Sequence, residues 1–206
     1  MTIKAILFDM DGVLIDARDW HYDALNNALN HFGYSISCES HLSTFDGLPT
    51  RVKLEMLSIS SGLPLGLHDL LNNLKQNYTL EISHARCKPI FIHQYALSRL
   101  KKLDLKLAVC SNSVRTTVET LMELSKLDRY LDLLLSSNDV TIPKPSPEIY
   151  LKAMEILNVN PSESLILEDN DHGLKAAYDS GAHVMRINSP RDVSFYNISQ
   201  FLKNIH

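Results

Sequence analysis

Apolar and polar positions divide the chain into two stretches of different periodicity. Ala5–Phe8 is a run of four apolar residues, which predicts a short buried strand. Between Asp16 and Arg86 the apolar residues instead recur every three or four positions. We find no strand pattern of comparable quality in that stretch, so we expect a strand followed by a small helical segment.

Three helices are expected in this segment. Thr50, after Gly47-Leu48-Pro49, is a candidate N-cap for the second helix, and leucines at helical spacing mark a third over 67–78. The first ends at Gly33, and its apolar positions are Trp20, Ala24, Leu25, Ala28, Leu29 and Phe32.

From Lys88 onwards, helical patterns alternate with short apolar runs. Strands are expected at 105–110, 131–135, 165–167 and 183–187, and helices at 92–102, 114–124, from Pro147 and at 172–180. Ser146 is the expected N-cap of the third of these helices, with Pro147 at its first position. This alternation predicts an α/β fold with a doubly wound, parallel five-stranded Rossmann-like sheet. The helical segment interrupts it, giving a core of 1–15 and 87–206 with an inserted α-helical cap at 16–86.

Composition narrows the functional classes. The net charge of −4, without a basic tail, gives no support for nucleic-acid binding. No apolar run approaches 18 residues and no signal-peptide core forms before Asp9, so we expect a cytoplasmic protein without membrane association. Cys38, Cys87 and Cys110 form no C-x-x-C pair, which suits reduced thiols. We expect a monomer or weak dimer.

Two aspartates and a glycine follow the first strand. Residues two apart in extended backbone share a face, so Asp9 and Asp11 are expected to project together, and Gly12 lets the chain turn away. Two carboxylates a few Å apart repel by roughly 1–4 kcal/mol at effective dielectric constants of 80 to 20. A bound cation or a shared proton would relieve that repulsion. For an isolated motif, a solvated Asp-Gly turn is the competing interpretation.

The later strands also end in polar residues. Ser111-Asn112-Ser113 follows the second strand, Lys144 stands between two prolines after the third, and 168–171 (Glu-Asp-Asn-Asp) follows the fourth. Ligands of such sheets bind beyond the carboxyl ends of the strands, where the strand order reverses. Each motif has a competing interpretation. Ser111-Asn112-Ser113 could be only a helix N-cap, Lys144 a solvated loop lysine, and 168–171 an acidic turn that binds nothing.

The order and spacing of these four motifs resemble the haloacid dehalogenase superfamily of aspartate-nucleophile phosphotransferases over nearly the whole chain. The position of the insertion is similar to the class with a small α-helical cap. The segments most similar to the β-phosphoglucomutase and phosphoglycolate-phosphatase-like branch are FDMDGVLID at 8–16, His21, Gly47-Leu48-Pro49 and KPSPEIY at 144–150.

This resemblance implies a phosphatase that acts on a small phosphorylated metabolite, such as a sugar or polyol phosphate, through an aspartyl-phosphate. Asp9 would be the nucleophile and Asp11 the general acid and base. Ser111 and the Asn112 amide would hold phosphoryl oxygens, and Lys144 would pair with both phosphate and nucleophile.

The cofactor implied is Mg²⁺. Its expected ligands are Asp9, the backbone carbonyl of Asp11, Asp169 and Glu168, the last directly or through water, with Asp171 further out. The histidines other than His21 show no spacing typical of a zinc site.

Residues of the cap would select the substrate. His21, Gly47, Thr50 and Arg51 are the candidates for contacts with it. His21 as a plain polar helix residue and Arg51 as an ordinary surface charge are the competing interpretations.

The mutase branch typically has an arginine directly after the cap glycine motif and a lysine late in the cap. Here Thr50 occupies the arginine position, and 77–80 contains no lysine. A mutase must hold a bisphosphate in two orientations, so we favour hydrolysis, with a sugar-phosphate mutase as the alternative. A non-catalytic binding protein is a remote third hypothesis. Dehalogenation is disfavoured, because that reaction would have no use for an acid and base at Asp11.

Overall fold

The computed structural model describes residues 2–205 and divides into two compact units. One, here called the core unit, runs up to Asp16 and resumes at Lys88. The other, the helical unit, is Ala17–Cys87. No helix in the described part of the chain is long and apolar enough to cross a membrane. The cysteines are free thiols, and two of them, Cys87 and Cys110, are buried.

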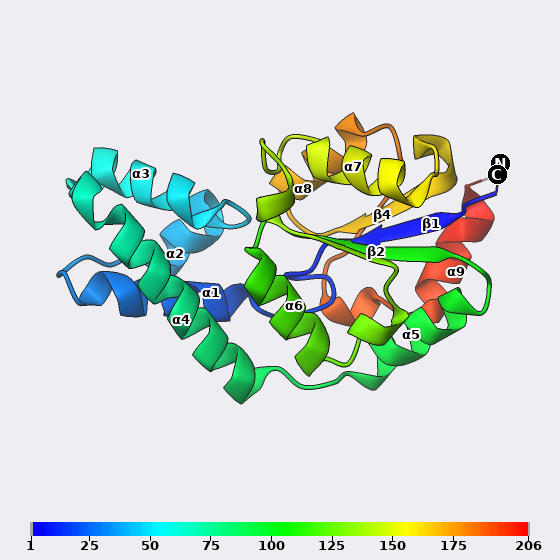
Figure 1. Ribbon diagram of the computed structural model, residues 1–206, viewed down its shortest axis with the longest axis horizontal. Helices are drawn as coiled ribbons and strands as arrows, with labels where there is room; N and C mark the ends of the chain where they lie inside the picture. Colours follow the sequence, from blue (N-terminus) through cyan, green and yellow to red (C-terminus); the bar gives the residue numbers. More distant parts are fainter. Residues whose placement is uncertain (1, 206) are drawn as a thin grey trace. The chain divides into compact units, whose positions relative to one another are not determined.

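The core unit is built on a five-stranded parallel sheet with the order β3-β2-β1-β4-β5 (Figure 1), which confirms the predicted fold class. Strand β1 is central and fully buried, and the strand order reverses there because β2 and β4 pair with its two edges. The strands are β1 (Ala5–Phe8), β2 (Lys106–Cys110), β3 (Leu133–Leu135), β4 (Ser164–Glu168) and β5 (His183–Arg186).

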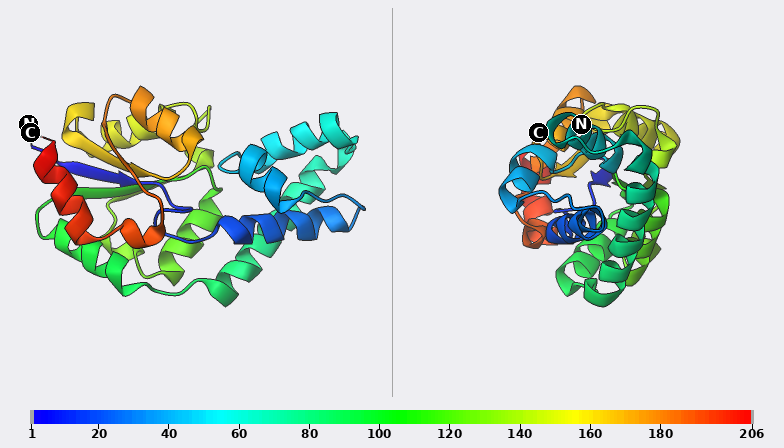
Figure 2. Two further views of the ribbon diagram at one scale, coloured as in Figure 1. Left: turned by 180° about the vertical axis from the view of Figure 1, so that it is seen from behind. Right: turned by 90° about the vertical axis from the view of Figure 1, so that its left-hand side faces the viewer.

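Helices cover both faces of this sheet. α7 and α8 lie on one face, and α5, α6 and α9 lie on the other, with α9 beside α5 (Figure 2, left). This is the arrangement that right-handed crossovers require when the order reverses at β1. The helices are α5 (Phe91–Lys101), α6 (Arg115–Leu124), α7 (Glu148–Leu157), α8 (Asp171–Asp179) and α9 (Phe195–Asn204).

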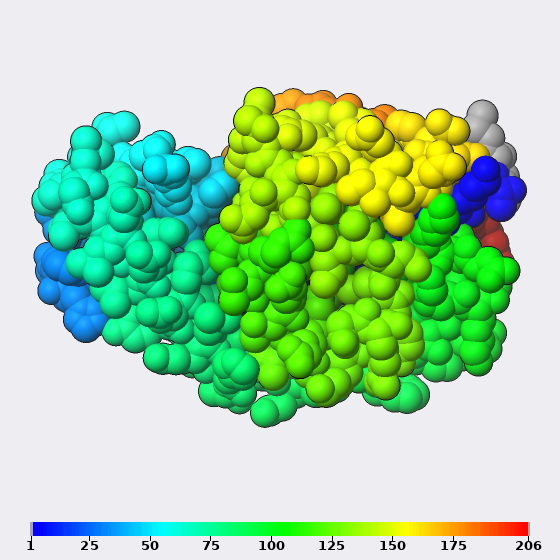
Figure 3. Space-filling view, viewed as in Figure 1, coloured from blue at the N-terminus to red at the C-terminus, as the bar shows by residue number. Residues whose placement is uncertain are grey.

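Burial in the core unit follows from this layering. Alternate residues of the central strands, including Leu7, Ala108 and Ile166, pack against apolar residues of α7 and α8 such as Ala153 and Ala177. In the space-filling view, atoms coloured green to yellow form most of the near surface of the core unit (Figure 3). The sheet therefore holds its strand ends at fixed positions.

The helical unit contains no strand within residues 17–87, as expected. Its long helices are α1 (Arg18–Asn30), α3 (Thr50–Ser61) and α4 (His68–Arg86), and α1 packs along α4. A short α2 (Cys38–Ser40) continues into a π-helical turn, His41–Phe45. Leucines of the three long helices form its core: Leu25, Leu29, Leu54, Leu57 and Leu71.

Several predicted boundaries are wrong by one or two residues. Thr50 is not an N-cap: Pro49 takes that position, and no side chain caps the helix. Pro147 is likewise the N-cap of α7 rather than its first residue, although Ser146 Oγ still accepts a hydrogen bond from the Glu148 amide (3.3 Å). Helix α9 was not predicted. Strand β3 is shorter than expected, because a 3₁₀ turn at Asp128–Tyr130 precedes it.

Candidate active site

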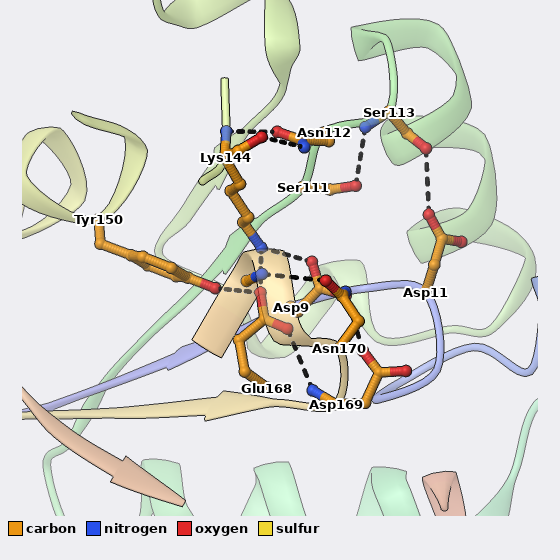
Figure 4. A network of polar contacts seen from close by, with 11 residues as sticks. Asp9, Asp11, Ser111, Asn112, Ser113, Lys144, Tyr150, Glu168, Asp169 and Asn170 are labelled. Carbon is orange, nitrogen blue, oxygen red and sulfur yellow. Dashed lines mark hydrogen bonds and ion pairs between the residues drawn. The ribbon is translucent and has the colours of Figure 1, made fainter. Parts of the chain in front are cut away.

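Charged and polar side chains meet at the carboxyl ends of β1, β2 and β4 in the core unit (Figure 4). Asp9 follows β1, Ser111 follows β2, and Glu168 is the last residue of β4. Lys144 reaches them from the loop between β3 and α7. Asp9, Lys144 and Glu168 are each more than nine-tenths buried, which is unusual for charged residues without partners.

Lys144 joins two carboxylates from different strands. Its Nζ donates to Asp9 Oδ1 at 2.6 Å and to Glu168 Oε1 at 2.5 Å. Burial alone would lower the pKa of this ammonium, but the Asp9 and Glu168 carboxylates outweigh that effect and raise its pKa. Lys144 is therefore a permanent positive charge in the site.

Asp9 lies where negative charge is in excess. Burial raises its pKa well above the ordinary value, the Glu168 carboxylate raises it further, and Lys144 acts in the opposite direction. Asp169 and Asp11 add smaller contributions of the same sign as Glu168. A further cation next to Asp9 would favour its ionised form.

Three carboxylates could hold that cation. Ligand oxygens of Asp9, Glu168 and Asp169 lie within 4.8 Å of one another. Two glycines leave the space that these oxygens occupy. A Cβ on Gly12, where φ is +84°, would stand 2.0 Å from Asp169 Oδ2, and one on Gly173 would stand 2.0 Å from Glu168 Oε1. An all-oxygen, anionic donor set of this kind fits Mg²⁺.

The Asp11 carboxylate acts on the same charged site as Asp9, because it raises the pKa of that residue. β1 ends at Phe8, so Asp11 is not in the strand, and the chain turns at Gly12. Asp11 Oδ2 accepts a hydrogen bond from Ser113 Oγ at 3.1 Å, and Figure 4 shows this pair apart from Lys144. The Asp11 carboxylate thus belongs to the β2 side of the site.

Asp171, which was expected further out than the ligands, is the first residue of α8. Its side chain is 89% exposed and forms an ion pair with Arg186 Nη2 at 3.3 Å. Asn170 is the N-cap of that helix and accepts from the Gly173 amide at 2.9 Å. Helix α8 therefore begins two residues after Asp169.

The segment after β2 contributes in two ways. Ser111 is buried, and its Oγ accepts from the Ser113 amide at 3.0 Å, which closes a tight turn. The Asn112 side chain makes two hydrogen bonds to the backbone of Lys144: Nδ2 donates to the carbonyl oxygen (3.2 Å), and Oδ1 accepts from the amide (3.0 Å). Sequence reasoning considered only the backbone of Asn112 and missed this pairing.

Tyr150 is a further member of the site that sequence reasoning missed. Its hydroxyl donates to Glu168 Oε1 at 2.6 Å, and Lys144 Nζ lies 4.7 Å from its ring centroid. Burial, followed by the nearby Glu168 carboxylate, raises the pKa of the phenol, so it remains a donor. The available signal was its place in the KPSPEIY segment, six residues after Lys144 on the first turn of a helix.

Candidate residues of the helical unit lie on its helices and turns. Gly47 has φ +73° in the turn before α3, Thr50 begins that helix, and Arg51 is exposed. His21 is on α1, with Nδ1 3.4 Å from Lys75 Nζ.

Two lysines of the helical unit are buried. The stretch 77–80 contains no lysine, but Lys75 of α4 lies just before it and is only 8% exposed. Lys53 of α3 is 7% exposed. Burial lowers the pKa of His41, and the positive charge of Lys53 lowers it further.

The chain is similar to known hydrolases over most of its length. Residues 6–187 match the family described as haloacid dehalogenase-like hydrolase. A phosphorylated carbohydrates phosphatase from Thermotoga maritima is 30% identical over 188 residues, which cover 87% of this chain and 82% of that protein. Pyrophosphatase PpaX from Bacillus mycoides is 28% identical over 200 residues, covering 91% and 84% of the two chains.

Among solved structures, a β-phosphoglucomutase from Clostridium difficile has the same fold, with a TM-score of 0.86 over 98% of both chains at 20% sequence identity. This likeness includes the helical segment inserted after the first strand.

Proposed function

The chain belongs to the haloacid dehalogenase-like hydrolase family, and from that premise we propose that it is a Mg²⁺-dependent phosphatase of small phosphorylated metabolites, with Asp9 as nucleophile. The observation that carries this proposal is the buried ammonium of Lys144, shared by Asp9 and Glu168 at the strand ends beside a third carboxylate. The phosphorylated carbohydrates phosphatase among its relatives supports a sugar or polyol phosphate as substrate.

In this proposal the two units have different tasks. The core unit carries the reacting groups, because Asp9, Lys144, Glu168 and Asp169 all belong to it. We propose that residues of the helical unit, the expected cap, select the substrate: His21, Gly47, Thr50 and Arg51. Phosphate monoesters are very inert, so both neutralisation of charge and an aligned nucleophile are needed.

Asp9 attacks phosphorus in the first step. A bond forms between its carboxylate oxygen and phosphorus, the ester P–O bond breaks, and the alcohol leaves after Asp11 protonates it. In the second step Asp11 takes a proton from water, whose oxygen attacks phosphorus and releases inorganic phosphate. Asp9 is then a free carboxylate again. The Ser113 hydroxyl holds Asp11 in place for both proton transfers.

Lys144 and the turn after β2 bind the phosphoryl group. The lysine ammonium has three donors, two of which contact Asp9 and Glu168, so one remains for a phosphoryl oxygen. Ser111 and the Asn112 amide, just before the N-terminal end of α6, face the same anion. The Asn112 side chain also fixes the backbone from which Lys144 projects.

Asp9, Asp169 and Glu168 would hold Mg²⁺, with the backbone carbonyl of Asp11 as a further ligand. When bound, the ion would neutralise charge on the phosphoryl oxygens. Burial and the Glu168 carboxylate raise the pKa of Asp9, and a bound cation would favour the ionised form that attacks phosphorus.

Replacement of the nucleophile tests the proposal. Asp9→Asn keeps the side-chain shape, and phosphate release from an aryl phosphate with Mg²⁺ should fall by about 10⁴- to 10⁶-fold. Asp171→Asn is the matched control, because that carboxylate is exposed and lies outside the cluster, and it should retain activity. Mass spectrometry of the quenched wild-type enzyme should detect a phosphoryl group on Asp9. Substantial turnover by Asp9→Asn would exclude the covalent route.

A sugar-phosphate mutase is the second candidate, and the buried Lys53 and Lys75 favour it. These two buried cations of the helical unit are candidates to bind the second phosphate of a bisphosphate, a role for which the stretch 77–80 offers no lysine. Phosphorus NMR of a sugar 1-phosphate supplied with catalytic bisphosphate separates the two. A phosphatase accumulates inorganic phosphate, whereas isomerised sugar phosphate without free phosphate would identify a mutase.

A further inference from the structure

Tyr150 contacts two members of the charged network without being a charged group itself. It is fully buried on the first turn of α7. Its hydroxyl donates to Glu168 Oε1 at 2.6 Å, and Lys144 Nζ is 4.7 Å from the centre of its ring. Figure 4 shows the phenol reaching Glu168 from the helix, while Lys144 arrives from its own loop.

Glu168 has a donor on each oxygen. Oε1 accepts from Lys144 Nζ (2.5 Å) and from Tyr150, and Oε2 accepts from the Asp169 amide (3.0 Å). The backbone at Gly173 approaches so closely that a Cβ there would stand 2.0 Å from Oε1. Rotation of the carboxylate would break at least one charge-assisted hydrogen bond, so its orientation depends on these donors.

Lys144 is shared between two acceptors, and Tyr150 affects how it is shared. Without the phenol, Lys144 would be the remaining side-chain donor to Glu168 Oε1, and the ammonium would be drawn toward Glu168 and away from Asp9. The hydroxyl satisfies part of the acceptor capacity of Oε1. The ring contributes a cation–π contact with the same ammonium.

We propose that Tyr150 is a positioning residue whose hydroxyl fixes the Glu168 carboxylate for a divalent cation and keeps Lys144 directed at Asp9. The inference rests on the proposed function for the identity of the cation, Mg²⁺. The hydroxyl is separable from the packing role of the ring, because phenylalanine fills nearly the same volume without donating a hydrogen bond.

Tyr150→Phe tests the role of the hydroxyl. Removal of a group that orients a metal ligand typically costs 10- to 100-fold in metal affinity or activity. We therefore expect the Mg²⁺ dissociation constant, measured by calorimetry without substrate, to rise about tenfold. Raised Mg²⁺ should restore part of the lost kcat. Tyr178→Phe, which alters an exposed tyrosine of α8, is the matched control and should match the wild type. A Tyr150→Phe affinity within twofold of the wild type would overturn the inference.

A double-mutant cycle shows whether the hydroxyl acts through Glu168. In a Glu168→Gln background, Tyr150→Phe should cause little further loss of Mg²⁺ affinity, because the carboxylate to be fixed is gone. Fully additive losses would contradict the proposed route. Tyr150→Met, which lacks both hydroxyl and ring, provides a second variant, and either one that folds is sufficient for the measurement.

Failure of this inference and failure of the proposed function give different results. A wild-type protein that binds Mg²⁺ but hydrolyses no phosphate ester would refute the phosphatase, while the calorimetric cycle would still test Tyr150. A wild-type phosphatase whose Mg²⁺ affinity is insensitive to Tyr150→Phe would refute only the role of Tyr150. Absence of Mg²⁺ binding in the wild type would refute both.

Discussion

The Asn112 side chain and the Lys144 backbone are joined by two hydrogen bonds, one in each direction. This pairing ties the turn after β2 to the loop after β3 over 32 positions of the chain. The lysine that contacts Asp9 and Glu168 is therefore placed by a neutral amide as well as by the charges it meets.

Asn112→Ala should separate stability from catalysis. Loss of two hydrogen bonds is expected to cost about 1–3 kcal/mol of unfolding free energy. Asn26 makes the same two-bond contact with the backbone of Ile36 in the helical unit, at 3.0 and 2.9 Å. Asn26→Ala should therefore lose similar stability in denaturant unfolding. Only Asn112→Ala should also lower kcat/KM, by about tenfold or more. Equal activity of the two variants would contradict the role of Asn112 in placing Lys144.

Asp11→Asn should slow both proton transfers, by about 10²- to 10⁴-fold. Ser113→Ala removes the hydroxyl that holds Asp11, and we expect a smaller loss of kcat, about tenfold, from one charge-assisted hydrogen bond. Ser164→Ala is the control. Its hydroxyl donates to the Asn160 carbonyl oxygen, and Ser164 is the first residue of β4, at the end of that strand opposite Glu168. Steady-state release of phosphate and the burst of released alcohol measure the two steps. Unchanged kcat in Asp11→Asn would exclude it as the acid and base.

Gly12→Ala should weaken Mg²⁺ binding, because the new Cβ would stand 2.0 Å from Asp169 Oδ2 and displace that carboxylate. The positive φ adds strain of about 1–2 kcal/mol. Gly33 has a similar φ of +76° but nothing within 4 Å of its Cβ position, so Gly33→Ala carries the strain alone. Thermal unfolding should show comparable strain in both, whereas calorimetry should show a loss of Mg²⁺ affinity, about tenfold or more, in Gly12→Ala only. Unchanged affinity would argue against Asp169 as a ligand.

His93 should make the core unit sensitive to acid. Burial lowers its pKa, although its Nε2 lies 2.7 Å from the Pro190 carbonyl oxygen, an acceptor that favours the protonated form. In the unfolded chain this histidine binds a proton near pH 6.5. Below that pH the unfolded state holds more protons than the folded state, so the unfolding free energy falls as the pH falls toward the lowered pKa. His93→Gln should lose less stability than the wild type between pH 7.5 and 5.5 in urea titrations. An identical decline would exclude His93 as a source.

The strand ends were predictable because parallel strands deliver their carboxyl termini to one edge. Asp9, Ser111 and Glu168 occupy such positions, so their meeting in space follows from the alternation of strands and helices, and Lys144 reaches them from the loop after β3. The contact between Asp11 and Ser113 was not predictable by the same argument. Both residues lie beyond the ends of their strands, where periodicity does not place side chains.

Other features depend on packing that periodicity does not encode. Tyr150 was assigned to a helix, but its contact with Glu168 requires the exact placement of α7 over the sheet. Gly173 is an ordinary helical residue in the sequence, and only its distance to Glu168 explains why it lacks a side chain. The burial of Lys53 and Lys75 was not predicted, because burial of lysine is rare and leaves no local pattern.

The central position of β1 has a consequence for how the protein reaches its native state. The strand that precedes Asp9 is hydrogen bonded to strands that begin only at Lys106 and Ser164. Pairings between segments so distant along the chain form slowly, because much loop entropy is lost before they contribute. During synthesis the first strand must therefore wait for most of the polypeptide to emerge from the ribosome. Recovery of catalysis after dilution from denaturant should accordingly be among the last signals to return.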